Sequence, residues 1–155
     1  MLSLTDPSWR LFKANYTDGS HVASLLQQAE SGEPINTWYE DLFQELCHQY
    51  TVSEAAYPAG PHLVRIASSR PELRKELLVL LGSCHASSGS SNRGSISDEV
   101  MEEWRSSAEA AVPLLLGLLA EHPESESDLC YLLCSLAAVH GYPELATAIE
   151  GLDAA

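Results

Sequence analysis

Apolar residues recur every three or four positions along most of the chain, which is the spacing of amphipathic helices. One such stripe follows a predicted helix cap at Ser20, and Gly32 is suited to end that helix. A broader stripe runs from Asn36 to Tyr50. Similar stripes cover residues 62–67, 71–84, 98–111, 113–122, 125–140 and 143–151. The pattern predicts an all-α fold.

Part of this pattern occurs twice. Residues 59–84 and 111–136 align without a gap, and nine positions carry the same residue in both: Ala59/Ala111, Pro61/Pro113, Leu63/Leu115, Pro71/Pro123, Glu72/Glu124, Leu77/Leu129, Leu80/Leu132, Leu81/Leu133 and Ser83/Ser135. Each unit predicts a helix pair that buries its apolar faces by stacking on a neighbour. The repeat therefore predicts a small helical-repeat solenoid of stacked helix pairs in which the shared leucines are buried at equivalent places.

The prolines of the repeat predict where its helices begin and end. A proline inside a helix removes a backbone hydrogen bond, whereas one at the first turn is tolerated. Pro61 is therefore expected at the first turn of a helix that follows a kink near Pro58, and Pro113 is expected to divide two helices. Pro71 and Pro143 are each expected to open a helix.

The 155 residues fit a single domain with four regions. Residues 1–34 form an N-terminal arm and a capping helix, and residues 35–84 form the first repeat region. Residues 85–97 are rich in serine and glycine and are expected to form a mobile surface loop. Residues 98–155 form the second repeat region and a terminal helix.

The formal net charge is −14, and it is unevenly distributed. Residues 98–155 carry twelve acidic side chains and one basic one, whereas residues 61–97 carry two acidic and five basic side chains. A field of this sign repels nucleic acids and anionic lipids and attracts a basic protein. The alternative interpretation is that the acidic residues only keep a small domain soluble.

Motifs that carry chemistry are missing from the sequence. There is no glycine-rich phosphate loop, HExxH pair, nucleophile elbow or zinc-type cysteine pair, so the chain is expected to be no enzyme and to hold no cofactor or metal. The cysteines Cys47, Cys84, Cys130 and Cys134 lie on apolar stripes, as reduced core cysteines do, although Cys130, Cys134 and His140 could also be imagined around a metal. With neither a signal peptide nor a membrane-spanning segment in view, we expect a cytoplasmic location.

Two sets of polar residues are candidates for partner binding. The first is an acidic cluster on the helix predicted from residue 98, formed by Glu99, Glu102, Glu103 and Glu109. Glu102 and Glu103 lie beyond the favourable first turn and lack helical cations in the pattern. The second set is His48 and His62, which are polar positions among apolar ones. Ordinary solvated surface is the alternative for the glutamates, and hydrogen bonding to free backbone carbonyls is the alternative for the histidines.

The segment LFQELCHQYTVSEAAYPAGPHLVRIA carries a resemblance to a known family. It is preceded by Tyr16-Thr17-Asp18-Gly19 and Val22-Ala23-Ser24-Leu25-Leu26, and it includes His48-Gln49-Tyr50-Thr51-Val52, where Tyr50 replaces a glycine of the family pattern. Over residues 9–120 the chain resembles bacterial HEAT-repeat-like proteins, some of which look like immunity proteins of secreted toxins.

The resemblance implies a protein-binding solenoid. Joined to the acidic charge, it predicts an immunity protein that neutralises a basic toxin domain. The alternatives are an adaptor or scaffold with a HEAT-like binding surface and, less favoured, an enzyme of the HEAT-like DNA glycosylase type. The oligomeric state stays open.

Overall fold

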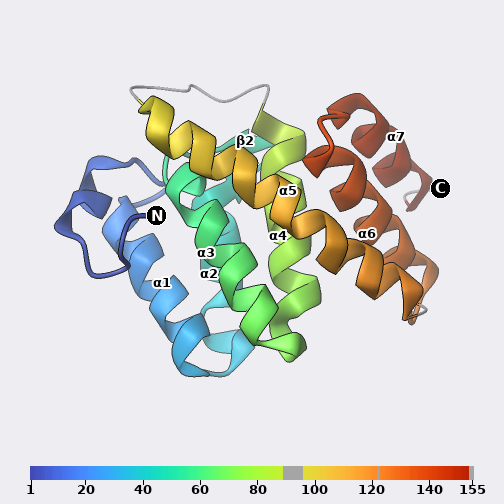
Figure 1. Ribbon diagram of the computed structural model, residues 1–155, viewed down its shortest axis with the longest axis horizontal. Coiled ribbons are helices and arrows are strands. Elements are labelled where there is room, and N and C mark those ends of the chain that lie inside the picture. Colours follow the sequence, from blue (N-terminus) through green and yellow to red (C-terminus); the bar gives the residue numbers. More distant parts are fainter. Residues whose placement is uncertain (89–95, 122, 154–155) are drawn as a thin grey trace.

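A computed structural model describes residues 1–88, 96–121 and 123–153, and these residues are mostly helical (Figure 1). The all-α prediction is confirmed. The α-helices are α1 (Gly19–Ser31), α2 (Tyr39–Leu46), α3 (Ala56–Ser69), α4 (Arg74–Ser87), α5 (Asp98–Ala120), α6 (Glu126–Val139) and α7 (Pro143–Asp153). Short 3-10 helices are η1 (Pro7–Leu11), η2 (Ile35–Thr37) and η3 (Pro71–Leu73), and two strands, β1 (Cys47–His48) and β2 (Thr51–Val52), form a small hairpin.

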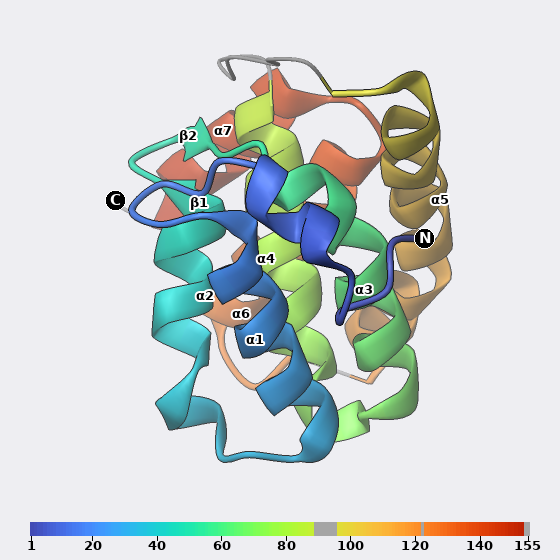
Figure 2. The same cartoon turned by 90° about the vertical axis from the view of Figure 1, so that its left-hand side faces the viewer.

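The helices pack mainly against near neighbours in the chain. Helix α1 lies against α2 and α3, and α3 lies against both α4 and α5. Helix α4 packs against α6, and α6 packs against α5 and α7 (Figures 1 and 2). The two sequence units thus correspond to α3 with α4 and to α5 with α6. The first helices of the two units contact each other, and so do the second helices.

Several helix ends follow the sequence signals. Gly32 ends α1 in the left-handed conformation with φ of 90°, and Ser125 caps α6 by accepting a hydrogen bond from the Asp128 amide at 3.0 Å. Ser97 caps α5 in the same way through the Val100 amide. The predicted cap at Ser20 is wrong, because the Asp18 carboxylate caps α1 by accepting the Ser20 amide at 2.8 Å.

The predictions drawn from the prolines are wrong for the first helix of each unit. Helix α3 runs without a break through Pro58 and Pro61, and α5 runs without a break through Pro113. Pro58 lies in the first turn, where the backbone N–H has no helical acceptor, so it costs no hydrogen bond. Pro61 and Pro113 each remove one helical hydrogen bond, and the burial along both helices outweighs that loss. Pro71 opens η3, and α4 begins three residues later.

The helix predicted from Asn36 to Tyr50 is shorter than expected. Helix α2 covers only Tyr39–Leu46, and the chain then forms the β1–β2 hairpin, in which Cys47 pairs with Val52 and His48 with Thr51. Gln49 and Tyr50 turn the hairpin with φ of 47° and 61°. Positive φ at both central residues is the pattern of a type I′ turn, which normally favours Asn-Gly. Tyr50 therefore adopts a left-handed backbone conformation that usually favours glycine.

The core contains all three tryptophans. Trp9, Trp38 and Trp104 are exposed by 1%, 1% and 4%, and the Trp104 ring stacks on His85 with centroids 3.9 Å apart. Trp104 also packs so closely on Gly60 that a Cβ there would meet the ring at 2.6 Å. Helices α4 and α6 approach equally closely, because a Cβ on Gly82 would lie 2.4 Å from Ser135 Cβ.

The predicted burial of the repeated leucines holds for the first unit and only partly for the second. Leu63, Leu77, Leu80 and Leu81 are fully buried, as are Leu115 and, to within 2%, Leu132. Leu129 and Leu133, however, are exposed by 39% and 37%. The prediction is wrong for these two, because nothing in the part of the chain that the structure describes covers their side of α6.

The predicted loop at 85–97 is too long at its N-terminal end. Helix α4 continues to Ser87, and Ser97 already caps α5. The predicted mobility of residues 89–95 lies outside the described residues. Among the helices that the structure describes, none is both long enough and apolar enough to cross a membrane.

Candidate protein-binding site

Three of the four candidate glutamates lie around one surface hollow. Helix α5 carries Glu99, Glu102 and Glu103, and together with Met1 they line a cavity of about 470 Å³ beside α3. The spacing of i, i+3 and i+4 places the three carboxylates on the same side of the helix. Glu109 is exposed on the same helix but does not line this hollow.

The floor of the hollow is apolar. Pro61 and Val64 of α3 and Ala110 of α5 line it, and Val64 is exposed by only 7%. Carboxylates around an apolar floor suit a lysine or arginine side chain, whose aliphatic stem packs on carbon while its charged head reaches the rim. We refer to this site as the α5 hollow.

Two carboxylates of the α5 hollow are paired. The N-terminal amine of Met1 donates to Glu103, and the Arg105 guanidinium lies 2.9 Å from Glu102. The expectation that both lack helical cations is therefore wrong for Glu102, and Glu103 is paired with a cation from outside its helix. The Arg105–Glu102 pair is exposed on both sides, so it contributes little stability and an incoming cation can replace it at small cost.

His48 lies away from this hollow, in strand β1. Its Nε2 is 3.0 Å from the Tyr16 hydroxyl, and its Nδ1 is 2.5 Å from Gln44 Oε1. Nearby, the buried Glu45 carboxylate accepts the backbone amides of Tyr16 and Thr17 at 3.0 and 3.2 Å. These bonds hold the N-terminal arm against α2, so His48 has a structural role here.

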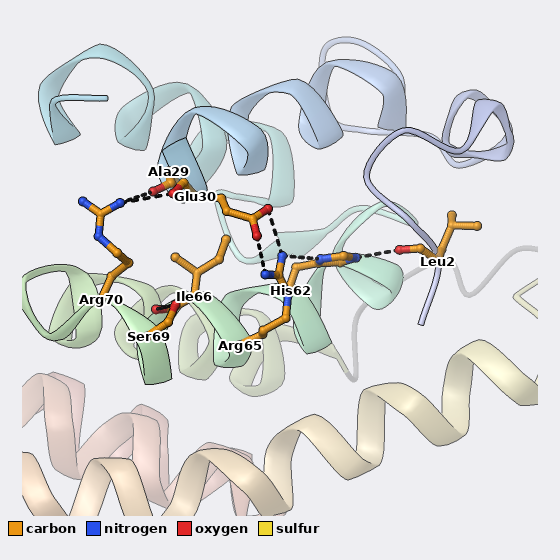
Figure 3. A network of polar contacts seen from close by, with 8 residues as sticks. All are labelled: Leu2, Ala29, Glu30, His62, Arg65, Ile66, Ser69 and Arg70. Carbon is orange, nitrogen blue, oxygen red and sulfur yellow. Dashed lines mark hydrogen bonds and ion pairs between the residues drawn. The ribbon is translucent and has the colours of Figure 1, made fainter. Parts of the chain in front are cut away.

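His62 is buried, with 2% of its surface exposed, and both ring nitrogens are engaged (Figure 3). Its Nε2 donates to the Leu2 carbonyl at 2.8 Å, and its Nδ1 lies 3.3 Å from the Arg65 guanidinium. Burial and the neighbouring Arg65 charge lower the pKa of His62 despite the bond to Leu2. His62 is thus a neutral side chain that fastens the N-terminus to α3, as the backbone-carbonyl alternative expected.

The same network ties α1 to α3. Arg65 makes two hydrogen bonds to Glu30, at 2.5 and 3.2 Å, and this partner lowers the pKa of Glu30 (Figure 3). Arg70 donates to the carbonyls of Ala29 and Glu30, both at 3.2 Å. Because these carbonyls lie in the last turn of α1, Arg70 satisfies acceptors that the helix itself cannot. The basic residues of this region therefore serve the fold.

A second cavity, of about 400 Å³, lies across α4 and was not predicted from the sequence. Phe43 and Val79 give it apolar walls, and Tyr50, Tyr131 and Glu150 lie at its edges. Its lining residues come from α2, the hairpin turn, α4, α6 and α7, so no local pattern could have indicated it.

Cys47 is among the lining residues of this second cavity. A hydrogen bond from the Cys84 thiol lowers the pKa of Cys47 to about 7. The same hydrogen bond, together with burial, raises the pKa of Cys84. Burial raises the pKa of Cys134, on the opposite wall, to about 11. All four cysteines are free thiols. Within the part of the chain that the structure describes, no three His, Cys, Asp or Glu side chains come together as a metal site would require.

The chain matches no protein-family model, no characterised protein and no solved structure at a significant level.

Proposed function

We propose that this chain is a protein-binding module of the HEAT-like solenoid type that captures a basic protein in the bacterial cytosol. The two sequence units support the solenoid, because α3 packs on α5 and α4 packs on α6 in the same order. The observation that carries the binding function is the α5 hollow, where three carboxylates surround an apolar floor. An immunity protein that neutralises a basic toxin domain fits this surface and the net charge of −14.

The physical basis of the proposed binding is a lysine or arginine of the partner entering the α5 hollow. Its stem would pack on Pro61 and Val64, and its head would take the place of Arg105 beside Glu102. The field of the acidic C-terminal half would speed the encounter, so the association rate should fall steeply as salt rises. The dissociation rate should depend less on salt.

Charge reversal in the α5 hollow tests the proposal. The probe is the product of the adjacent gene, co-expressed with the chain and scored for growth and for complex formation. Replacing Glu99, Glu102 and Glu103 with lysine should abolish protection and weaken capture at least tenfold, about 1.4 kcal/mol. Circular dichroism should show that the variant keeps its helices.

The matched control changes the net charge by the same amount elsewhere. Glu33, Asp41 and Glu121 are exposed, and none of them lines the α5 hollow. Reversing these three should leave capture within a factor of about three, since distant exposed charges are screened by salt. If the parent and the variant with lysine at the α5 hollow capture the partner equally well, the assignment of the site is refuted. If both charge-reversed variants weaken capture equally, the effect comes from the overall charge and not from the α5 hollow.

A further inference from the structure

Two of the four cysteines are in contact at the wall of the second cavity, the one of about 400 Å³ that lies across α4. Cys47, the first residue of β1, lines this cavity and is exposed by 5%. Cys84 of α4 is not among the lining residues and is fully buried. The Cys84 thiol donates a hydrogen bond to the Cys47 sulfur, so the two sulfur atoms are neighbours. One thiol thus faces the cavity, and the other lies behind it.

A small reagent can reach the Cys47 sulfur from solvent. Tyr50 and Tyr131 line the cavity and are exposed by 68% and 45%, so the cavity reaches the surface. The Cys47 sulfur lies 3.8 Å from the Ser83 carbonyl oxygen and 3.8 Å from the Ser87 hydroxyl oxygen, and both serines line the cavity. A water molecule occupies about 30 Å³ in the liquid, so a cavity of this volume holds a reagent the size of hydrogen peroxide.

The hydrogen bonds around Cys47 favour its thiolate, which is the form of cysteine that peroxides oxidise. The Cys84 thiol and the Ser87 hydroxyl both donate to it, and they lower the pKa of Cys47 to about 7. Burial and the carboxylate of Glu150, which also lines the cavity, act in the opposite direction and are outweighed. About half of the Cys47 side chains are therefore ionised at neutral pH.

Cys134, on the opposite wall, has the reverse environment. Its thiol donates to the Ala146 carbonyl at 3.1 Å, and only the protonated form can make that bond. Burial, with smaller contributions from Glu150 and Cys130, raises the pKa of Cys134 to about 11. The two thiols of one cavity therefore differ in reactivity, and Cys134 serves as an internal reference for Cys47.

We propose that Cys47 is a site of oxidation by hydroperoxides and that Cys84 converts the first product into a Cys47–Cys84 disulfide. In the first step the Cys47 thiolate attacks one oxygen of hydrogen peroxide, the O–O bond breaks, and hydroxide leaves, which gives a sulfenic acid. In the second step the Cys84 sulfur attacks the sulfenic sulfur and the S–O bond breaks. Water leaves, and its second hydrogen comes from the Cys84 thiol. The two thiols lose two electrons in total, and the peroxide accepts them.

The order of the two steps follows from the positions of the thiols. Cys47 meets the peroxide because it lines the cavity, whereas Cys84 is fully buried and meets only the oxidised sulfur beside it. The disulfide would join β1 to α4 and so fix the β1–β2 hairpin at the edge of the cavity. Neither cysteine lines the α5 hollow, so this chemistry is separate from the proposed capture of a partner.

The test treats the folded, reduced protein with a small molar excess of hydrogen peroxide at neutral pH. The remaining thiols are then alkylated in denaturant, and the products are mapped by mass spectrometry. A linked Cys47–Cys84 peptide should form, with the protein mass lowered by that of two hydrogen atoms, and dithiothreitol should restore all four free thiols. Cys47 should be oxidised about tenfold or more faster than Cys134, because its larger thiolate fraction outweighs the lower nucleophilicity of a low-pKa thiol.

Substitutions separate the roles of the two cysteines. Cys84→Ala should stop the reaction at the Cys47 sulfenic acid, which dimedone traps as an adduct. Cys47→Ser should leave Cys84 reduced, because Cys84 is fully buried. Cys134→Ser is the matched control at the other thiol of the cavity wall, and it should form the disulfide at the rate of the parent. Circular dichroism checks the fold of each variant, and the peptide map of the parent decides the question if a variant unfolds.

Two results would overturn the proposal. In the first, Cys47 stays reduced or is oxidised no faster than Cys134, so the cavity and its hydrogen bonds confer no reactivity. In the second, Cys47 of the parent is oxidised but forms no disulfide, so Cys84 is a core residue and nothing more. Either result leaves the test of the α5 hollow unaffected.

Discussion

Replacing Gly82 with alanine should destabilise the protein by separating α4 from α6. The added Cβ would lie 2.4 Å from Ser135 Cβ and 2.5 Å from Ser135 Cα. Carbon atoms in ordinary contact are about 3.5–4.0 Å apart, so the helices must move apart by about 1 Å. A side-chain rotation cannot relieve the contact, because one of the two atoms belongs to the backbone of α6.

The expected size of the effect follows from two opposing contributions. Overpacking of a close contact costs about 1–3 kcal/mol, and the backbone position of Ser135 Cα places Gly82→Ala at the upper end. Alanine recovers up to about 1 kcal/mol of helix propensity relative to glycine. The free energy of unfolding should therefore fall by about 2 kcal/mol.

Gly117 supplies a matched control for the same chemical change. It lies inside α5, and a Cβ there would meet no described atom within 4 Å. Gly117→Ala should thus gain helix propensity without a clash and raise the free energy of unfolding by about 1 kcal/mol. The two substitutions should have opposite signs and differ by about 3 kcal/mol.

Urea unfolding followed by far-ultraviolet circular dichroism measures both effects. The midpoints should move in opposite directions while the slopes stay constant, which identifies a change in stability rather than in the unfolded state. A stabilising or neutral Gly82→Ala would refute the close approach of α4 and α6.

Two further predictions concern stability. Burial lowers the pKa of His85 to about 4 from an ordinary 6.5, so the unfolded chain takes up a proton first as the pH falls, and His85 should cost about 2 kcal/mol of stability near pH 5. Urea titrations at neutral pH and near pH 5 should show this loss of stability in the parent. The loss should be mostly absent in His85→Phe, which keeps an aromatic ring stacked on Trp104. An equal loss in both proteins would contradict the assignment of the pH dependence to His85. Leu77→Ala should cost about 3 kcal/mol at a fully buried site, and Leu129→Ala, 39% exposed at the equivalent position, about 1 kcal/mol. Equal costs in urea unfolding would mean that Leu129 is covered as Leu77 is.

The helices were predictable from the spacing of their apolar residues, but the local rules for proline did not predict where the helices begin and end. Pro61 and Pro113 occupy the same repeat position, and both lie inside continuous helices. The proline rule considers only the lost hydrogen bond. The stability of the helix also depends on the burial of residues such as Tyr57 and Leu63 on either side of Pro61. A pattern read locally could not include that contribution.

The sequence predicted which glutamates form the candidate site, but it did not predict which groups lie beside them. The spacing of Glu99, Glu102 and Glu103 on one helix follows from sequence alone. The Met1 amine beside Glu103 lies 102 residues away in the sequence, and no periodicity relates the two. Likewise, Leu77 and Leu129 occupy equivalent positions of the two sequence units, and their different exposure depends on what packs against each of them in space.

The placement of the tryptophans determines what an optical experiment on this protein can detect. Trp9, Trp38 and Trp104 all lie before α6, and beyond Trp104 the aromatic residues are only Tyr131 and Tyr142. Intrinsic tryptophan fluorescence therefore reports the unfolding of η1 to α5 and is blind to a separate opening of α6 and α7. Circular dichroism counts every helix equally, so coincidence of the two transitions is a test of cooperative unfolding. Where the dichroism transition comes first, the fluorescence midpoint describes only the larger, N-terminal part of the molecule.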